Sequence, residues 1–172
     1  MNARKFHKKS IMVEKTPHIL VIDDDWMNRE VIEAHLQIEK YAVTTTSSGS
    51  EGLKMAFATP PDLVILDAML PDISGFEVCQ RLKNHAATRI VPVMMVTALE
   101  SDEDKQKGLE SGADDFLTKP FSFILLLTRV RTLIRLKRLQ ENLRDSYALL
   151  ERLLNRPIDA EIIQKTLNND QP

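Results

Sequence analysis

Several side chains that could carry out phosphoryl transfer directly follow short apolar runs: Asp67 after residues 63–66, Asp23, Asp24 and Asp25 after residues 19–22, and Thr97 after residues 93–96. Lys119 follows a fourth short segment, residues 115–118. Runs of this length, rich in β-branched residues, are typical of strands buried on both faces. The carboxyl ends of parallel strands meet at one edge of a sheet, where open α/β sheets hold their ligands. Carboxylates, a hydroxyl and an ammonium at one edge indicate a phosphoryl-transfer site that uses a metal ion.

Asp67 is the candidate nucleophile, because a carboxylate can attack a phosphoryl group and form an acyl phosphate. Carboxylates that lie close together repel one another, so the site should favour a divalent cation. Mg²⁺ suits it, because this hard ion takes few protein oxygens and completes its shell with water and phosphate oxygens. An acidic cluster can also simply favour a helix N-terminus. That simpler explanation fits Asp25 better than Asp23 or Asp24.

The strands that would position these groups alternate with helical stretches, which favours βα units on a parallel sheet. The predicted strands are His18–Ile22, Tyr41–Thr46, Leu63–Leu66, Val93–Val96 and Asp115–Thr118. Ser50 is the predicted cap of the second helix. Gly112 should end the helix that begins at Asp102.

The last predicted helix begins after Ser122 and is too long for an ordinary domain helix. Its apolar residues fall in two sets: Leu126, Val130 and Leu133 first, then Leu136, Leu139, Leu143, Leu150 and Leu153. The second set fits a heptad repeat that is interrupted at Ser146, and the steps of three from 133 to 139 mark a shift of phase. The first set should pack on the sheet. The second should pair with a second copy of the chain in a parallel coiled coil, in preference to folding back on the core.

The chain should therefore comprise a flexible arm over residues 1–16, a domain over residues 17–137 and a helical extension over residues 138–172. Its 172 residues, 43% hydrophobic content and net charge of −2 are ordinary for a globular protein and give no case for general nucleic-acid or membrane affinity. One cysteine cannot form an internal disulfide. A cytoplasmic setting is the expectation.

The ordered motifs resemble those of a response-regulator receiver domain. They are Val21-Ile22-Asp23-Asp24, then Asp67-Ala68-Met69-Leu70-Pro71 with Gly75 downstream, then Thr97-Ala98 and Lys119-Pro120-Phe121. The resemblance implies a flavodoxin-like, doubly wound α/β fold. Its five parallel strands would run in the order 2-1-3-4-5, followed here by an extended last helix.

The resemblance also implies a role for each site residue. Asp67 would be the phosphoacceptor. Mg²⁺ would be ligated by Asp24, Asp67 and the backbone carbonyl of Met69, with Asp23 holding a coordinated water. Lys119 and Thr97 would contact the phosphoryl oxygens, and Phe116 would move inward with Thr97. The peptide bond before Pro120 would be cis, which proline makes feasible.

The resulting prediction is a two-component signalling switch that receives its phosphoryl group from a histidine kinase or phosphotransfer protein and forms a homodimer through the last helix. Self-catalysed dephosphorylation should be slow, because Met69 and Leu99 cannot orient an attacking water. A receiver fragment that regulates a dimeric output enzyme, such as a nucleotide cyclase, is an alternative. So is a non-phosphorylated pseudo-receiver, although it would be expected to lose one of the site residues.

Other classes fit less well. A haloacid-dehalogenase-like phosphatase needs a second acid two residues after the nucleophile, where Met69 stands, so the chain is not expected to be an enzyme beyond the chemistry of Asp67 itself. Residues 155–172 are too few for a DNA-binding helix-turn-helix, so direct nucleic-acid binding is not expected.

Overall fold

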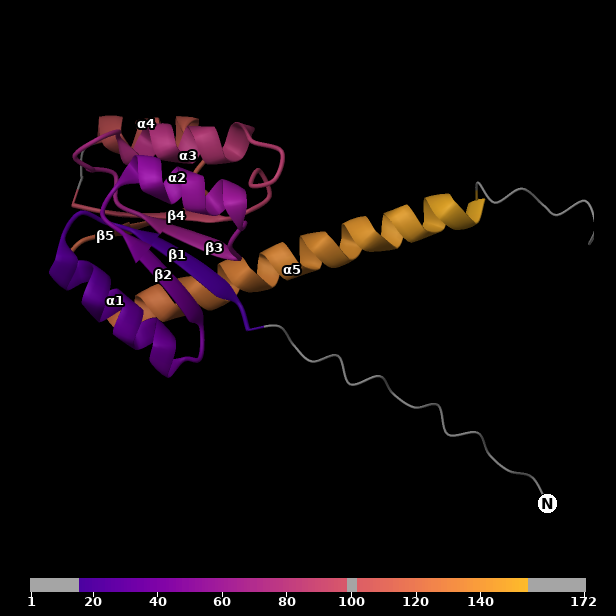
Figure 1. The fold of residues 1–172 in the computed structure, drawn as a ribbon, viewed down its shortest axis with the longest axis horizontal. Helices are drawn as coiled ribbons and strands as arrows, with labels where there is room; N and C mark the ends of the chain where they lie inside the picture. Colours follow the sequence, from indigo (N-terminus) through magenta and orange to yellow (C-terminus); the bar gives the residue numbers. More distant parts are fainter. Residues whose placement is uncertain (1–15, 99–101, 155–172) are drawn as a thin grey trace, which may run out of the picture. The chain divides into compact units, whose positions relative to one another are not determined.

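The computed structural model describes residues 16–98 and 102–154, in which strands and helices alternate along the chain (Figure 1). The elements are β1 (His18–Ile22), α1 (Trp26–Ile38), β2 (Ala42–Thr46), α2 (Gly49–Ala58), β3 (Leu63–Leu66), α3 (Gly75–Asn84), β4 (Val93–Thr97), α4 (Asp102–Glu110), β5 (Asp115–Thr118) and α5 (Phe123–Leu154). The bounds agree closely with the prediction, except that β2 begins one residue later and β4 includes Thr97. The expected arm and the residues after 154 lie outside the described residues.

The strands form one parallel sheet in the order β2-β1-β3-β4-β5, which confirms the predicted fold. Ile22 pairs with Leu66 and Thr97 pairs with Thr118 at the carboxyl ends. Backbone hydrogen bonds continue one residue further, from Asp67 N to Ile22 O and from Lys119 N to Thr97 O. This register brings the polar residues that follow the strands to one edge of the sheet.

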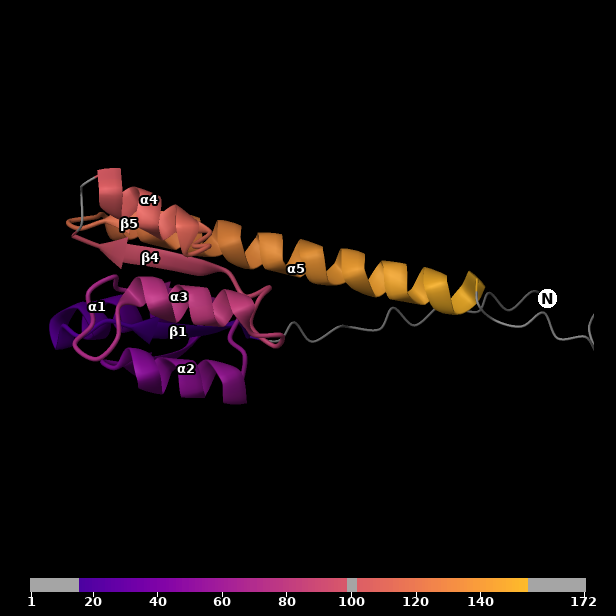
Figure 2. The same cartoon turned by 90° about the horizontal axis from the view of Figure 1, so that it is seen from above.

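The sheet separates two apolar layers, as expected for strands that are buried on both faces. Along β1, Ile19 and Val21 belong to one layer and Leu20 and Ile22 to the other. Figures 1 and 2 both show α2 and α3 side by side, over the second layer. The helix residues are Ile32, Leu36, Leu126, Val130, Leu133 and Ile134 in the first layer, and Leu53, Ala56, Val78, Cys79 and Leu82 in the second.

The helix ends follow local side-chain chemistry. Asp25 caps α1 and accepts a hydrogen bond from Met27 N. Ser48, and not the predicted Ser50, caps α2: its hydroxyl accepts from Glu51 N, while the Ser50 amide is bound by a distant carboxylate. The prediction was wrong because three serines, at positions 47, 48 and 50, stand at this helix start and only the fold selects between them. Gly112 follows α4 with a φ of 85°, as predicted for a helix C-terminus.

The chain divides into two compact units between Ile134 and Arg135. In the first unit, Leu126 and Val130 of α5 are fully buried. In the second unit the leucines of α5 are more than half exposed, with Leu136 at 51% and Leu143 at 58%. Among the described residues, no helix combines the length and the apolar character that crossing a bilayer requires.

Candidate functional site

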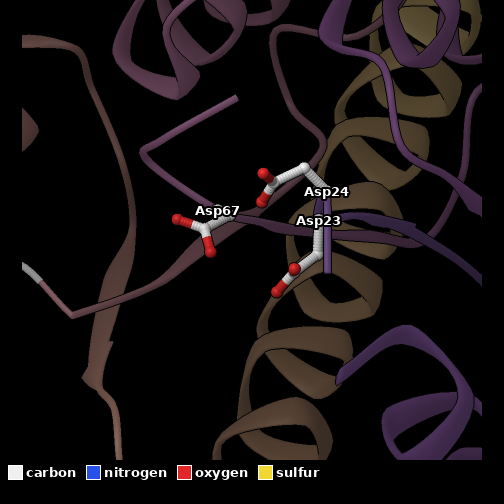
Figure 3. Close-up of side chains that lie close together, drawn as sticks. All are labelled: Asp23, Asp24 and Asp67. Atoms are coloured by element: carbon white, nitrogen blue, oxygen red, sulfur yellow. The ribbon is translucent and has the colours of Figure 1, made fainter. Parts of the chain in front are cut away.

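Three carboxylates meet at the carboxyl edge of the sheet (Figure 3). Asp23 and Asp24 follow β1, Asp67 follows β3, and each offers an oxygen within 4.8 Å of the others. Asp23 and Asp67 are buried, whereas Asp24 is exposed. Hard oxygen donors at this spacing, with one side open to solvent, fit a small divalent cation that keeps part of its water shell.

Lys119 joins two of these carboxylates. Its Nζ donates hydrogen bonds of 2.7 Å to Asp23 Oδ2 and 2.5 Å to Asp67 Oδ2. With all groups ionised, the cluster keeps an excess of two negative charges, which a divalent cation would neutralise. The ammonium thus holds two carboxylates together without removing the need for a metal.

Burial and pairing act in opposite directions on these groups. Burial raises the pKa of Asp23 above its ordinary value, and the hydrogen bond from Lys119 only partly opposes this. Burial alone would lower the pKa of Lys119, but hydrogen bonds and attraction from Asp23 and Asp67 outweigh it and raise that pKa. Lys119 is therefore a permanent cation at neutral pH.

The loop after β3 holds Asp67 by several contacts. Met69 N donates to Asp67 Oδ1 at 2.9 Å, which leaves Oδ2 to Lys119. Gly75 lies directly under this loop: a Cβ there would be 2.0 Å from the backbone oxygen of Asp67. Only glycine allows α3 to begin so close to the nucleophile. The side chain of Met69 is 64% exposed.

The same loop is tied to the start of α2 through Asp72, which the sequence analysis did not single out. Asp72 accepts hydrogen bonds from the amides of Ser50 and Gly49, at 2.9 and 3.0 Å, and from the Ser48 hydroxyl at 2.9 Å. These bonds, led by that from the Ser50 amide, hold the pKa of Asp72 far below its ordinary value. A carboxylate thus satisfies the unpaired amides at a helix N-terminus.

Arg29 of α1 is a second residue near the site that the sequence did not indicate. Its Nη1 donates to the backbone oxygens of Asp23 at 2.6 Å and Asp24 at 3.0 Å. The helix dipole disfavours a cation at the end of a helix's first turn. The unusual position of Arg29 is the one feature of the sequence that could have indicated a special role for it.

The remaining predicted residues lie around this edge. Thr97 ends β4 and is buried. Phe116 in β5 is half-buried and packs on Gly108 of α4, where a Cβ would be 2.2 Å from Phe116 Cε1. The peptide bond between Lys119 and Pro120 is cis. Leu99 lies outside the described residues.

A family model described as the response regulator receiver domain matches residues 19–131. Among curated proteins, the chain is 45% identical over 130 residues to the response regulator PleD of Caulobacter vibrioides, covering 76% of this chain and 29% of PleD. It is also 45% identical over 119 residues to the DNA-binding dual master transcriptional regulator RpaA of Synechocystis, covering 69% of this chain and 49% of RpaA. The chain thus spans half or less of these relatives.

Solved structures give the same result. The chemotaxis protein CheY4 of Vibrio cholerae has a TM-score of 0.66 and 30% identity, covering 69% of this chain and 99% of that one. The beryllofluoride-activated DrrB receiver domain has a TM-score of 0.64 and 35% identity, covering 70% of this chain and 99% of that one. With its sheet order and its matched residues 19–131, the chain belongs to the response regulator receiver family, the switch modules of two-component signalling.

Proposed function

We propose that Asp67 accepts a phosphoryl group from a histidine kinase or phosphotransfer protein, in a site completed by Mg²⁺. The observation that carries this proposal is the cluster of three carboxylates within 4.8 Å, two of them bridged by Lys119. Asp24, Asp67 and the Met69 carbonyl would hold the metal directly, and Asp23 through a water. When bound, Mg²⁺ supplies positive charge against the phosphoryl oxygens.

In the proposed transfer, an Asp67 oxygen bonds to phosphorus as the phosphorus–nitrogen bond of phosphohistidine breaks. The electron pair of the broken bond leaves with the imidazole, which takes up a proton from water. Lys119 already contacts Asp67 Oδ2, so its charge stands next to the incoming phosphoryl oxygens without further rearrangement. Beyond this chemistry of Asp67, the chain has no proposed enzymatic activity.

Thr97 and Phe116 are the proposed switch. Thr97 ends the strand beside β5 and would bond a phosphoryl oxygen through its hydroxyl, and Phe116 would follow it inward. Phe116 now packs in the space that Gly108 leaves free, so its present position depends on the missing Cβ. A charge that pulls Thr97 inward would then shift the balance between two positions of the ring.

The proposed phosphoryl group is long-lived. The Met69 side chain beside the nucleophile carries no group that could orient an attacking water. Loss of phosphate within seconds from the purified, phosphorylated chain would contradict this part of the proposal.

The proposed output is homodimerisation through residues 136–153 of α5. Leu136, Leu143 and Leu150 occupy a positions of a heptad, and Leu139 and Leu153 occupy d positions. Each of the five is more than half exposed. A second copy would bury them in a coiled coil. This same stripe favours a second candidate, a receiver that controls a dimeric output enzyme such as a nucleotide cyclase.

The test uses Trp26, the only tryptophan of the chain, which begins α1 two residues after Asp24. Its fluorescence should change on addition of Mg²⁺ and change again with beryllofluoride, which mimics a bound phosphoryl group. Asp67→Asn should keep at most a weakened response to Mg²⁺ and lose the second change. Wild-type protein with no response to Mg²⁺, confirmed by calorimetry, would refute the metal site.

The dimer is tested separately by sedimentation, with and without beryllofluoride. A mass that rises with beryllofluoride supports phosphorylation-driven dimerisation. A constant mass of two chains indicates a constitutive coiled coil, and a constant mass of one chain would refute the homodimer.

A further inference from the structure

Arg29 donates hydrogen bonds to three consecutive backbone carbonyls of the loop that carries Asp23 and Asp24. Its amide donates to Asp25 O at 3.1 Å as the first hydrogen bond of α1. Its Nη1 reaches back to Asp23 O at 2.6 Å and Asp24 O at 3.0 Å. One half-buried residue thus binds all three carbonyls of the turn between β1 and α1, two through its side chain and one through its amide.

The other contacts of this turn leave the Asp24 carboxylate without direct support. Asp23 is fixed by Lys119 and by the amide of Asp25, and Asp25 is fixed by Met27 N. Within residues 16–98 and 102–154, the exposed Asp24 carboxylate shows no hydrogen bond or ion pair. The backbone of Asp24 therefore sets the orientation of its carboxylate. Repulsion from the carboxylates of Asp23 and Asp67 favours an orientation away from the site.

The two bonds from Arg29 act on that backbone. The carbonyls of Asp23 and Asp24 belong to the two peptide planes on either side of the Asp24 Cα. Fixing both planes restricts the backbone torsions of Asp24 and hence the direction of its carboxylate. Hydrogen bonds from a charged donor are the stronger kind, so Arg29 can hold the turn against the repulsion within the cluster.

Arg29 also brings a positive charge toward a site for a dication, and this effect has the opposite sign. If charge dominated, removing Arg29 would strengthen Mg²⁺ binding. If positioning dominated, removing it would weaken binding, because residues that orient metal ligands typically account for about 10–100-fold in affinity. The charge is spread over a guanidinium at the edge of an exposed site, where water screens it, so positioning should dominate.

We propose that Arg29 is a positioning residue of the metal site, which holds the β1–α1 turn so that Asp24 faces Asp23 and Asp67. The inference rests on the proposed function for the identity of the ion, and its test is the affinity for Mg²⁺ alone, measured by calorimetry on the intact chain.

Arg29→Ala should weaken Mg²⁺ binding roughly tenfold or more. Arg29→Lys keeps the charge but replaces the guanidinium by a shorter ammonium, so it should recover only part of the affinity. The matched control is Arg81→Ala on α3. Arg81 is exposed and, among the residues that the structure describes, pairs with Glu77 alone, one turn earlier, so its removal should leave the affinity unchanged.

Urea unfolding without Mg²⁺ separates positioning from general destabilisation, because Arg29→Ala should bind Mg²⁺ weakly while still folded. If Arg29→Ala does not fold, the same comparison is made with Arg29→Lys and Arg29→Gln, which should bind Mg²⁺ more weakly than the wild type while still folded. Binding by the folded variants that equals or exceeds the wild type would overturn the inference and leave the proposed function intact. Absence of Mg²⁺ binding in the wild type would overturn both.

Discussion

The two parts of α5 on either side of residue 134 are equally rich in leucine but differ in burial. Leu126 and Val130 are fully buried in the layer between α1 and the sheet, whereas Leu139 and Leu143 are 55% and 58% exposed. The steps of three between residues 133 and 139 fall at this change. An apolar stripe therefore shows only that a helix needs a partner. Whether that partner belongs to the same chain depends on what the fold places against it.

The largest effect should come from truncating the buried part. Leu126→Ala should destabilise the chain by about 2–5 kcal/mol, because it leaves a cavity in the first apolar layer. Urea unfolding at low protein concentration measures this loss. Leu139→Ala is the matched control and should stay within about 0.5 kcal/mol. An equal loss in both variants would mean that the two parts of α5 do not differ.

Truncating the exposed part should affect association instead. Leu143→Ala combined with Leu150→Ala should weaken self-association at least about tenfold, because both residues occupy a positions of the heptad. Sedimentation over a range of concentrations gives the dissociation constant. Leu149→Ala, next in sequence to Leu150 but off the a and d positions, should have a clearly smaller effect. Equal effects would argue against the heptad interface.

The stability of the domain should depend on pH through Asp72, in the loop between β3 and α3, whereas the proposed association of α5 should not. The pKa of Asp72 is lowered in the folded state, so its ionised form stabilises the fold above the unfolded pKa of about 3.8. This contribution is lost as pH falls below that value toward the folded pKa. Asp72→Asn should therefore lower the urea midpoint at pH 7, and its difference from the wild type should shrink in acid. The proposed association through the leucines of α5 should not depend on Asp72 at any pH.

A difference that stayed constant from pH 7 down to pH 3 would show that the Asp72 side chain acts without its charge. The same measurement on Glu77→Gln, a half-buried acid on α3 that pairs with Arg81, controls for general acid effects.

The smallest effect concerns the end of α1. Lys40 has a φ of 64°, a left-handed conformation that favours glycine. Its amide and that of Tyr41 donate to Gln37 O and Leu36 O, so the turn itself is well formed. Lys40→Gly should raise the free energy of unfolding by about 0.5–1 kcal/mol and leave self-association unchanged. A loss of stability would mean that the Lys40 side chain makes a contact that outweighs its backbone strain.

Much of the site could be predicted because it depends on strand ends. A strand buried on both faces has to be apolar, so Asp67 marks its end directly, and parallel pairing then brings Lys119 to the same edge. Arg29 and Asp72 could not be predicted in this way. Each acts on backbone groups of a neighbouring loop, and backbone groups leave no pattern in a sequence. The choice of Ser48 over Ser50 has the same cause, because the Asp72 carboxylate occupies the Ser50 amide.

The three adjacent aspartates that follow β1 should differ in how many other residue types each position tolerates. Asp25 serves as a helix cap, a task that serine, threonine or asparagine performs about as well. Asp24 is exposed, and in the proposed metal site it would have only to present an oxygen to a cation. Asp23 is buried and bound on both sides, by Lys119 and by the amide of Asp25, so a replacement that lacks either acceptor would leave a buried group unpaired. Among diverging descendants of this chain, tolerance to substitution should therefore rise step by step from Asp23 to Asp25, although the ancestral residues were identical.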